Sequence, residues 1–497
     1  MALELVAVAA TLVALGLVAV YKYLTSPFSY FEKQGVSGPK PTIFFGSWSG
    51  AWNKFLGDED MKNVKEYGKV YGTYDGRTPN LIVSDPDLIK VVLVEQASNF
   101  RDYRSSCVKH NLLHNALLAV SDSQPPEVKD VLATISSKDF FSKVSPHIVE
   151  AASNLTQSVR KLAEGGQQVE ISKEVTSFVG SALARSILGL PETDSQFLEA
   201  CAAAFHVDRP NSMVAVIPFI YPKLSPLDEF ILKKKALSYL TSKIQQVLTE
   251  KKKAEVGEKK GTDALDVLLK VASEVTKVDD DVTEKVVRLS DEQIVSQALG
   301  FILNSSLVTR KLVAEAVYVL ASKPELQDKL HVELVKHTMD KPSYEGLEGA
   351  ELLDTLVGDL LRLYPSEFRL VRQCASEVQL GSVKLGEGHL VSVPVFAVHR
   401  QDEYFPKADT LNPTRLSRGS SEKLVDYTFL PFGQAGFEGK SLVTQYGVLA
   451  AKLAIAVLVK TLKFSANDET KEQLEFQKGV TGVPCLKPIS VSAEPRK

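Results

Sequence analysis

Residues 429–452 read FLPFGQAGFEGKSLVTQYGVLAAK. Pro431-Phe432-Gly433 opens a loop, because proline and glycine interrupt regular structure. From Tyr446 the segment is apolar and continues through Lys452 as a predicted helix. The stretch therefore predicts a loop that leads into a long apolar helix, and that loop contains no cysteine.

The whole chain has an ordinary globular composition. It contains 497 residues, of which 44% are hydrophobic and 24% are charged, enough for one large domain or for two or three small ones. Lys and Arg number 58 against 61 Asp and Glu, so the charge balance gives no indication of a nucleic-acid partner. The four cysteines are far apart and form no CxxC pair, which argues against a disulfide scaffold and a structural zinc site; they are Cys107, Cys201, Cys374 and Cys485.

The N-terminal segment has the length and composition of a membrane span. Ala2 to Val20 is apolar apart from Glu4. About 19 residues at ~1.5 Å each reach roughly 28 Å, close to the thickness of a bilayer core. Tyr21 and Tyr23 follow at the expected position of the membrane interface. A cleaved signal peptide is the alternative, although the segment lacks the basic start that such peptides have.

The charges after this span predict its orientation. Lys22, Lys33 and Lys40 follow the apolar run, so the positive-inside rule leaves the bulk of the chain in the cytosol. We expect a signal-anchor transmembrane helix at 1–24 and a proline-containing connector at 25–48. The rest, 49–497, is predicted to be one domain of a single-pass protein of the endoplasmic reticulum membrane.

The remaining patterns are mostly helical. Ser290-Asp291-Glu292-Gln293 is a capping box that begins an apolar helix, and Pro324 ends it. About 33 residues make a helix of roughly 50 Å, long enough to cross a domain as a buried central element. Shorter alternating segments, such as Leu390-Val391-Ser392-Val393, predict strands. The fold class expected is mainly α with a smaller β-sheet.

The order of several short motifs resembles a microsomal cytochrome P450 from end to end, closest to the branch of vertebrate drug-oxidising enzymes and thromboxane synthase. The motifs are Tyr71-Gly72-Thr73-Tyr74-Asp75-Gly76, Ser84-Asp85-Pro86-Asp87, Arg362-Leu363-Tyr364-Pro365, Ala397-Val398-His399-Arg400, Asn412-Pro413-Thr414-Arg415-Leu416 and Pro431-Phe432-Gly433. Each string is weak by itself, whereas their common order and spacing are specific. The resemblance implies a cytochrome P450 fold after one transmembrane helix, with haem as cofactor and lipophilic substrates.

The resemblance also implies a buried salt-bridge triad that holds the fold. In this chain the triad would be Asp359, Arg362 and Arg415. Aspartate replaces the family's glutamate, which shortens the reach by one methylene and keeps the charge. The alternative is a solvated i,i+3 ion pair, but the apolar Leu360 and Leu361 between the two partners favour burial.

The family's haem-binding cysteine has no counterpart in the loop. Counting forward from Pro431-Phe432-Gly433 places its position at Gly439, and counting back from Tyr446 places it at Ser441. The two counts differ by two residues, so the loop has also gained length. Glycine or an ordinary serine hydroxyl cannot replace a thiolate as iron ligand. Phe432 and Gly433 would still border the cofactor position.

The family's oxygen-activating motif is also altered. The family carries Ala-Gly-x-Asp/Glu-Thr on its central helix, where an acid and an alcohol deliver protons. The resemblance places this motif at Asn304, Ser305, Ser306, Leu307 and Val308. The acid has become leucine and the alcohol valine. Thr309 follows directly, but one residue turns a helix by about 100°, so its hydroxyl is expected to point elsewhere.

The partners of the haem propionates are weakened as well. A Trp-x-x-x-Arg pair appears as Pro125 and Lys129, whereas Arg372 remains a candidate contact. Buried propionates without cationic partners are unfavourable, so we predict that haem is absent or weakly bound. No metal site is predicted either, because His110 and His114, spaced i,i+4, have no evident third ligand.

Together these patterns predict a catalytically inactive pseudoenzyme anchored in the membrane. It would bind a lipophilic small molecule, another P450 or the P450 reductase. The first alternative is an active haem enzyme with non-cysteine ligation, acting as a monooxygenase or a peroxide isomerase. The second is a decayed product that folds poorly, and the undisturbed helix pattern argues against it.

Overall fold

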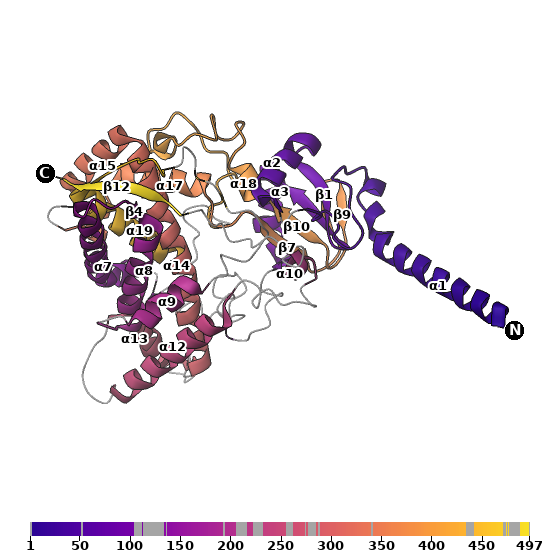
Figure 1. Ribbon diagram of the computed structural model, residues 1–497, viewed down its shortest axis with the longest axis horizontal. Coiled ribbons are helices and arrows are strands. Elements are labelled where there is room, and N and C mark those ends of the chain that lie inside the picture. Colours follow the sequence, from indigo (N-terminus) through magenta and orange to yellow (C-terminus); the bar gives the residue numbers. More distant parts are fainter. Residues whose placement is uncertain are drawn as a thin grey trace.

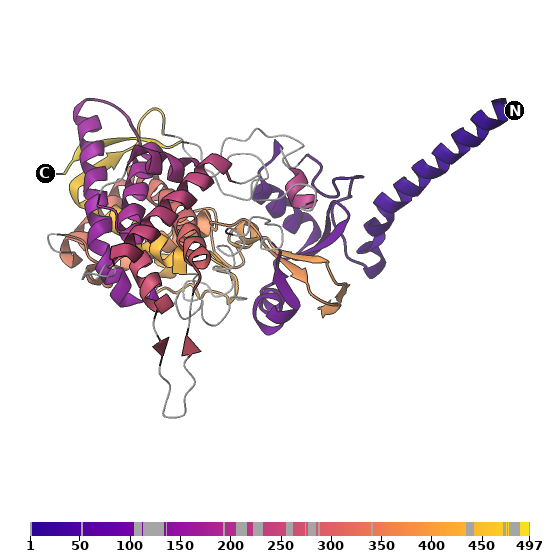
Figure 2. The same ribbon diagram turned by 90° about the horizontal axis from the view of Figure 1, so that it is seen from below.

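The molecule divides into a helical part and a smaller sheet-containing part, with the N-terminal helix projecting beyond the sheet (Figure 1). The computed structural model describes residues 2–50, 53–103, 112, 134–135, 137–191, 194–204, 216–221, 232–254, 262–273, 275–276, 285–286, 289–338, 341–433, 442–470, 474, 476 and 488–496. Figure 2 shows the same division from a perpendicular direction, with the two ends of the chain on opposite sides.

The helical part is built around α14 (Asp291–Ser322). Ser290 caps its first turn: the Ser290 hydroxyl accepts from the Gln293 N–H at 3.2 Å, and the Gln293 side chain accepts from the Ser290 N–H at 2.8 Å. This confirms the predicted capping box. Most side chains between Ile294 and Ala321 are buried, because neighbouring helices surround α14 on most sides. The other elements here are α7 (Lys138–Glu164), α8 (Ile171–Leu188), α9 (Ser195–Ala203), α12 (Lys234–Ala254), α13 (Ala264–Ser273), α15 (Pro324–His337), α16 (Tyr344–Leu347), α17 (Glu351–Leu363), η7 (Pro413–Leu416) and α19 (Leu442–Thr461). Two short helices, α10 (Ile217–Ile220) and α18 (Val395–Val398), lie with the sheet instead (Figure 1).

The main sheet is mixed and has the strand order β1-β2-β10-β7-β3. Strands β2 and β10 run parallel, and the other neighbours are antiparallel. These strands are β1 (Val70–Asp75), β2 (Thr78–Val83), β3 (Phe100–Asp102), β7 (Leu370–Cys374) and β10 (Leu390–Val393). Smaller sheets pair β11 (Leu462–Ser465) with β12 (Ser490–Pro495) and β4 (Val169–Glu170), β5 (Val275–Thr276) with β6 (Lys285–Val286), and β8 (Val378–Leu380) with β9 (Val383–Leu385). The predicted mainly α fold with a smaller sheet is therefore confirmed.

The N-terminal helix α1 (Ala2–Thr25) exposes its apolar side chains, including Leu12 and Leu17. Within the described part of the chain, Leu5–Gln34 is the one helical stretch long and apolar enough to cross a membrane, and its most apolar window is not buried by the rest of the protein. A surface of this kind is stable in lipid rather than in water, so α1 indicates membrane anchoring.

The segment after α1 packs onto the main sheet. Phe31 is 3% exposed in a cluster with Tyr74, and the backbone of Gly38 lies so close to Gly72 that a Cβ would meet the Gly72 carbonyl oxygen. The short elements here are η1 (Ser26–Ser29), η2 (Glu32–Gln34), α2 (Leu56–Tyr67), α3 (Pro86–Lys90), a π-helical turn η4 (Val91–Glu95) and η5 (Ala97–Asn99). The connector is thus fixed against the sheet rather than extended in solvent.

Candidate functional site

Three side chains from two distant segments meet around one buried carboxylate. Asp359 and Arg362 lie on α17, and Arg415 lies in η7. The Arg362 Nε lies 2.6 Å from Asp359 Oδ1, and the Arg415 Nε lies 3.3 Å from the same oxygen. The backbone N–H of Asn412 donates to Asp359 Oδ2 at 2.6 Å. One aspartate therefore receives two guanidinium groups and a backbone donor.

The two guanidinium groups also bind backbone carbonyls. Arg362 donates to the carbonyl oxygens of His399, Ala408 and Thr410 at 2.9, 2.6 and 3.1 Å. Arg415 donates to the Pro406 carbonyl oxygen at 3.1 Å and to the Glu422 carboxylate at 2.9 Å. Both arginines are at most 2% exposed, so these bonds provide the compensation that buried charges need. The cluster ties α17 to the irregular segment that precedes the loop after Gly433.

His399 connects the same helix to that loop. Its Nδ1 lies 3.0 Å from the Arg362 carbonyl oxygen, and its Nε2 accepts from the Leu430 N–H at 2.8 Å. Burial lowers the pKa of His399 to about 3, and the neighbouring cations act in the same direction. The imidazole is therefore neutral, with both ring nitrogens in use. The structure places it beside the sheet as a packing and hydrogen-bonding residue.

The five residues that the resemblance assigns to the oxygen-activating motif lie on an uninterrupted part of α14. Asn304 donates its side-chain amide to the Gly300 carbonyl oxygen at 2.9 Å. Ser305, Ser306 and Val308 are buried, whereas Leu307 is half-buried; these four residues follow Asn304 on the helix. None of these five side chains carries an acidic group.

Val308 and Thr309 both reach the neighbouring helix α19. The Thr309 hydroxyl donates to the Gly447 carbonyl oxygen at 3.2 Å. A Cβ built on Gly447 would lie 3.0 Å from the Cβ of Val308. The close approach of the two helices at Gly447 therefore uses both residues as packing contacts.

The loop positions are placed only in part. Phe432 packs against the main core, and Gly433 has a φ of 90°, a left-handed conformation that suits glycine. Arg372 is half-buried on β7, and its guanidinium donates to the Val371 carbonyl oxygen at 3.2 Å. Gly439, Ser441 and Lys129 lie outside the described residues, as do His110 and His114.

The described residues do not fit an iron-thiolate centre. The two cysteines among them, Cys201 on α9 and Cys374 on β7, are buried thiols, and burial raises their pKa to about 12 and about 11. Thiols of this kind are protonated at neutral pH, and iron binds the thiolate. Tyr446 is a buried phenol that donates to the Ala182 carbonyl oxygen at 3.3 Å, and burial raises its pKa as well. Each of these three groups is held by the protein core.

Sequence reasoning missed a buried ion pair on α14. Lys311 lies 3.6 Å from Glu315, and neither residue is more than 8% exposed. Lys311 donates to the carbonyl oxygens of Tyr364 and Pro365, which cap the end of α17. The signal was two charges spaced i,i+4 inside an otherwise apolar helix, a pattern that sequence alone assigns equally well to a solvated face.

Comparison with known proteins identifies the family. The family model described as Cytochrome P450 matches residues 36–436. Curated relatives include cytochrome P450 3A17 of Cavia porcellus, 28% identical over 96% of this chain and 95% of the relative. Cytochrome P450 3A12 of Canis lupus familiaris is 27% identical over 98% and 96%, and cytochrome P450 3A29 of Sus scrofa is 28% identical over 98% and 96%. The family implies haem, iron and monooxygenase chemistry, and the chain belongs to the cytochrome P450 family.

Proposed function

We propose that this chain is a membrane-anchored pseudoenzyme of the P450 family that lacks oxygen activation. The observation that carries the proposal is the distribution of thiols. The sequence contains no cysteine between Cys374 and Cys485, and therefore none in the loop before α19. The two described cysteines are buried elsewhere with raised pKa values, so neither is suited to supply a thiolate ligand.

A second line of support is the end of the family match. The matched residues stop at 436, ahead of both Gly439 and Ser441, the two candidate positions of the lost ligand. The acid–alcohol positions, Leu307 and Val308, carry only apolar side chains. Loss of the ligand together with loss of the proton-delivery pair is the combination expected when selection for oxygen chemistry has ended.

The fold of the protein would be retained without oxygen activation. We propose that Asp359, Arg362 and Arg415 act as the family's structural triad, because they bind one another in a site closed to water. We assign residues 1–24 to a single-pass anchor in the endoplasmic reticulum membrane, 25–48 to the connector and 49–497 to a cytosolic domain. A folded domain of this kind retains the capacity to bind a lipophilic ligand, a P450 or the reductase.

The decisive experiment measures haem in the purified full chain. Pyridine haemochrome content gives the stoichiometry, and a reduced-plus-CO difference spectrum of the same sample reports the iron ligand. We expect folded protein with far less than one haem per chain and no thiolate-type CO band. A full haem complement without that band supports the alternative, an enzyme with non-cysteine ligation. A normal thiolate band refutes the proposal.

Variants that restore a cysteine in the loop test which position carried the iron ligand. Gly439→Cys and Ser441→Cys return a thiol to the two candidate positions, and Ser382→Cys, in the exposed turn between β8 and β9, is the matched control. An increase in haem content with one loop variant and none with the control shows which position faced the iron. Lys129 and Arg372, the remaining candidate propionate contacts, can then be replaced by glutamine in that variant to measure their contribution.

A further inference from the structure

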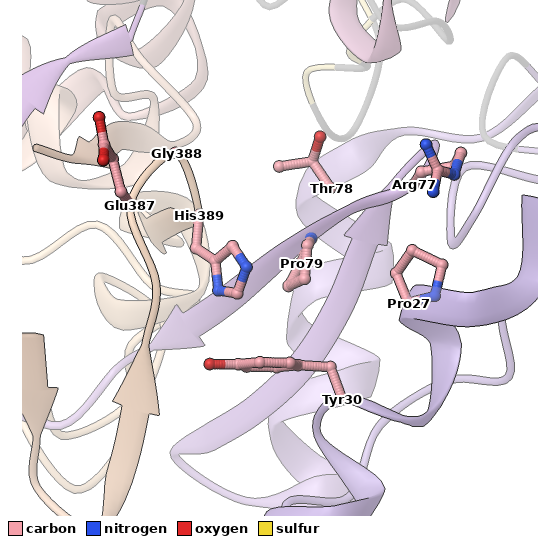
Figure 3. Close-up of a pocket in the computed structure, with 8 residues that line it drawn as sticks. All are labelled: Pro27, Tyr30, Arg77, Thr78, Pro79, Glu387, Gly388 and His389. Atoms are coloured by element: carbon pink, nitrogen blue, oxygen red, sulfur yellow. The ribbon is translucent and has the colours of Figure 1, made fainter. Parts of the chain in front are cut away.

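A surface cavity of about 350 Å³ lies where the connector meets the main sheet. Its walls come from η1 and the residue after it, from the turn between β1 and β2 together with the start of β2, and from the turn between β9 and β10. They include Tyr30, Arg77, Thr78, Pro79, Glu387 and His389 (Figure 3). The volume lies at the lower end of the range for small-molecule sites, which is roughly 300–1,000 Å³. Neither the P450 chemistry nor the proposed function accounts for this cavity.

The cavity lies at the depth of the membrane interface. The guanidinium carbon of Arg77 lies 3.6 Å from the ring centroid of Tyr23, which belongs to the last turn of α1. Tyr23 comes three residues after Val20, the end of the apolar run of α1, at the level where tyrosine side chains meet lipid headgroups. Arg77 therefore lies beside the headgroup layer when α1 spans the bilayer.

Two ionic groups of opposite sign border the cavity. Figure 3 shows Arg77 and Glu387 at opposite ends, with Pro79 and His389 between them. The Arg77 Nε is buried without a hydrogen-bond partner, and within the described residues its guanidinium has no ion pair. Glu387 is exposed and likewise has no ion pair in the described part of the chain. Neither charge is therefore neutralised by an opposite charge among the described residues.

The wall between these charges is aromatic and apolar. Tyr30 packs edge to face against His389, with ring centroids 4.6 Å apart. The Tyr30 hydroxyl donates to the Lys384 carbonyl oxygen at 2.6 Å, which fixes the ring. His389 Nδ1 accepts from the Gly386 N–H at 3.1 Å, so its proton is on Nε2. An aromatic and apolar wall of this kind suits the short carbon linker of a headgroup. The Nε2–H of His389 adds one hydrogen-bond donor.

We propose that this cavity binds the headgroup of a zwitterionic phospholipid, with the phosphate at Arg77 and the ammonium group at Glu387. A guanidinium offers paired donors to phosphate oxygens, and a carboxylate beside an aromatic ring attracts an ammonium group. The presence of a carboxylate as well as a guanidinium distinguishes this ligand from a purely anionic lipid. Binding would hold the cytosolic domain in one orientation against the bilayer.

Lipid binding is measured with the purified full chain in detergent by native mass spectrometry. The probes are dihexanoylphosphatidylcholine, which carries both charges, dihexanoylphosphatidylglycerol, which carries only the phosphate charge, and inorganic phosphate. We expect the choline lipid to bind more tightly than the glycerol lipid, and inorganic phosphate to bind far more weakly than either. Equal binding of all three probes, or tighter binding of the glycerol lipid, would overturn the proposal.

Variants that remove one charge each test whether the phosphate binds at Arg77 and the ammonium group at Glu387. Arg77→Gln should lower the affinity for both lipids about tenfold, because a charge-assisted contact to phosphate is lost. Glu387→Gln should lower the affinity for the choline lipid several-fold. The affinity for the glycerol lipid should stay unchanged or increase. Arg160→Gln and Glu164→Gln remove the same charges from exposed positions on α7 and should change neither affinity. If the cavity variants behave like these controls, the site does not exist.

Folding of the variants is checked by thermal unfolding. Arg77→Lys keeps the positive charge and should retain choline-lipid affinity to within about threefold, because lysine binds phosphate as a point charge. Since Glu387 is exposed, Glu387→Gln tests the ammonium end without disturbing packing. Haem content is not part of any readout, so failure of this proposal is independent of the pseudoenzyme proposal.

Discussion

The Nε of Arg362 lies 2.6 Å from Oδ1 of Asp359, and both side chains are fully buried. Arg415 approaches the same oxygen at 3.3 Å from a segment more than fifty residues further along the chain. The carboxylate is therefore the common partner of two cations that water cannot reach. Its removal leaves the buried Arg362 without its anionic partner, whereas Arg415 keeps the Glu422 carboxylate.

Asp359→Asn is expected to destabilise the protein by about 3–5 kcal/mol, because a buried ion pair loses one partner. The measurement is guanidinium-induced unfolding in mild detergent, followed by circular dichroism. Asp328→Asn is the control: it breaks an ion pair to Arg496 whose carboxylate is 56% exposed, and should change stability by less than about 1 kcal/mol. Equal effects of the two substitutions would contradict the structural role of Asp359.

The buried Glu315 predicts a pH-dependent stability. Both Glu315 carboxylate oxygens are buried and have no hydrogen-bond partner among the described residues. Burial raises the pKa of Glu315 to about 8, against the partial compensation of Lys311. Between an unfolded pKa near 4.5 and a folded pKa near 8, the folded state holds the additional proton. Stability contributed by this group is therefore present in full below pH 4.5 and is lost as the pH rises toward 8.

Glu315→Gln is expected to flatten the stability profile between pH 5 and pH 8, because the glutamine cannot ionise. The substitution should reduce the slope of the unfolding free energy against pH by at most about 1.4 kcal/mol per pH unit. Thermal unfolding at several pH values measures it, and Glu292→Gln, an exposed carboxylate on the same helix, serves as control. A slope retained in the Glu315 variant would show that another group titrates.

Gly38 fixes the connector against the sheet. A Cβ at this position would overlap the Gly72 carbonyl oxygen and lie 2.9 Å from its carbon, and backbone atoms cannot move aside cheaply. Gly38→Ala should therefore destabilise the protein by at least about 1–3 kcal/mol and accelerate proteolysis between residues 26 and 48. Gly419→Ala, with no atom within 4 Å of the added carbon, should be neutral. An unchanged cleavage rate for Gly38→Ala would rule out this contact.

Gly447 and Val308 form a matched pair at the contact of α14 with α19. Gly447→Ala brings its new carbon within 3.0 Å of the Val308 Cβ, so we expect a loss of about 1–3 kcal/mol. Val308→Ala in the same chain removes the γ-methyl groups and should recover part of that loss. A double-mutant cycle of unfolding free energies gives the coupling, and strictly additive effects would show that the two residues do not share this contact.

Local signals in the sequence were sufficient for the elements themselves. The capping box at Ser290 and the N-cap at Asp85, whose side chain accepts from the N–H groups of Asp87 and Leu88, are made by neighbours within four residues. The hairpin of β1 and β2 is likewise formed by neighbouring residues, which a two-residue turn connects. Short-range contacts of this kind are encoded by residue type and spacing, so they can be inferred without a tertiary structure.

The sequence by itself determined that the loop before α19 carries no thiol, because a missing residue type needs no coordinates to establish. It also determined the membrane-spanning composition of α1 and the i,i+3 spacing of Asp359 and Arg362. Only the tertiary structure decided that Arg415 reaches the same carboxylate, that Glu315 is buried beside Lys311, and that Arg77 stacks on Tyr23. These contacts join segments far apart in the chain or depend on complete burial. Their energies depend on distance and on exclusion of water, which folding sets and a linear sequence does not contain.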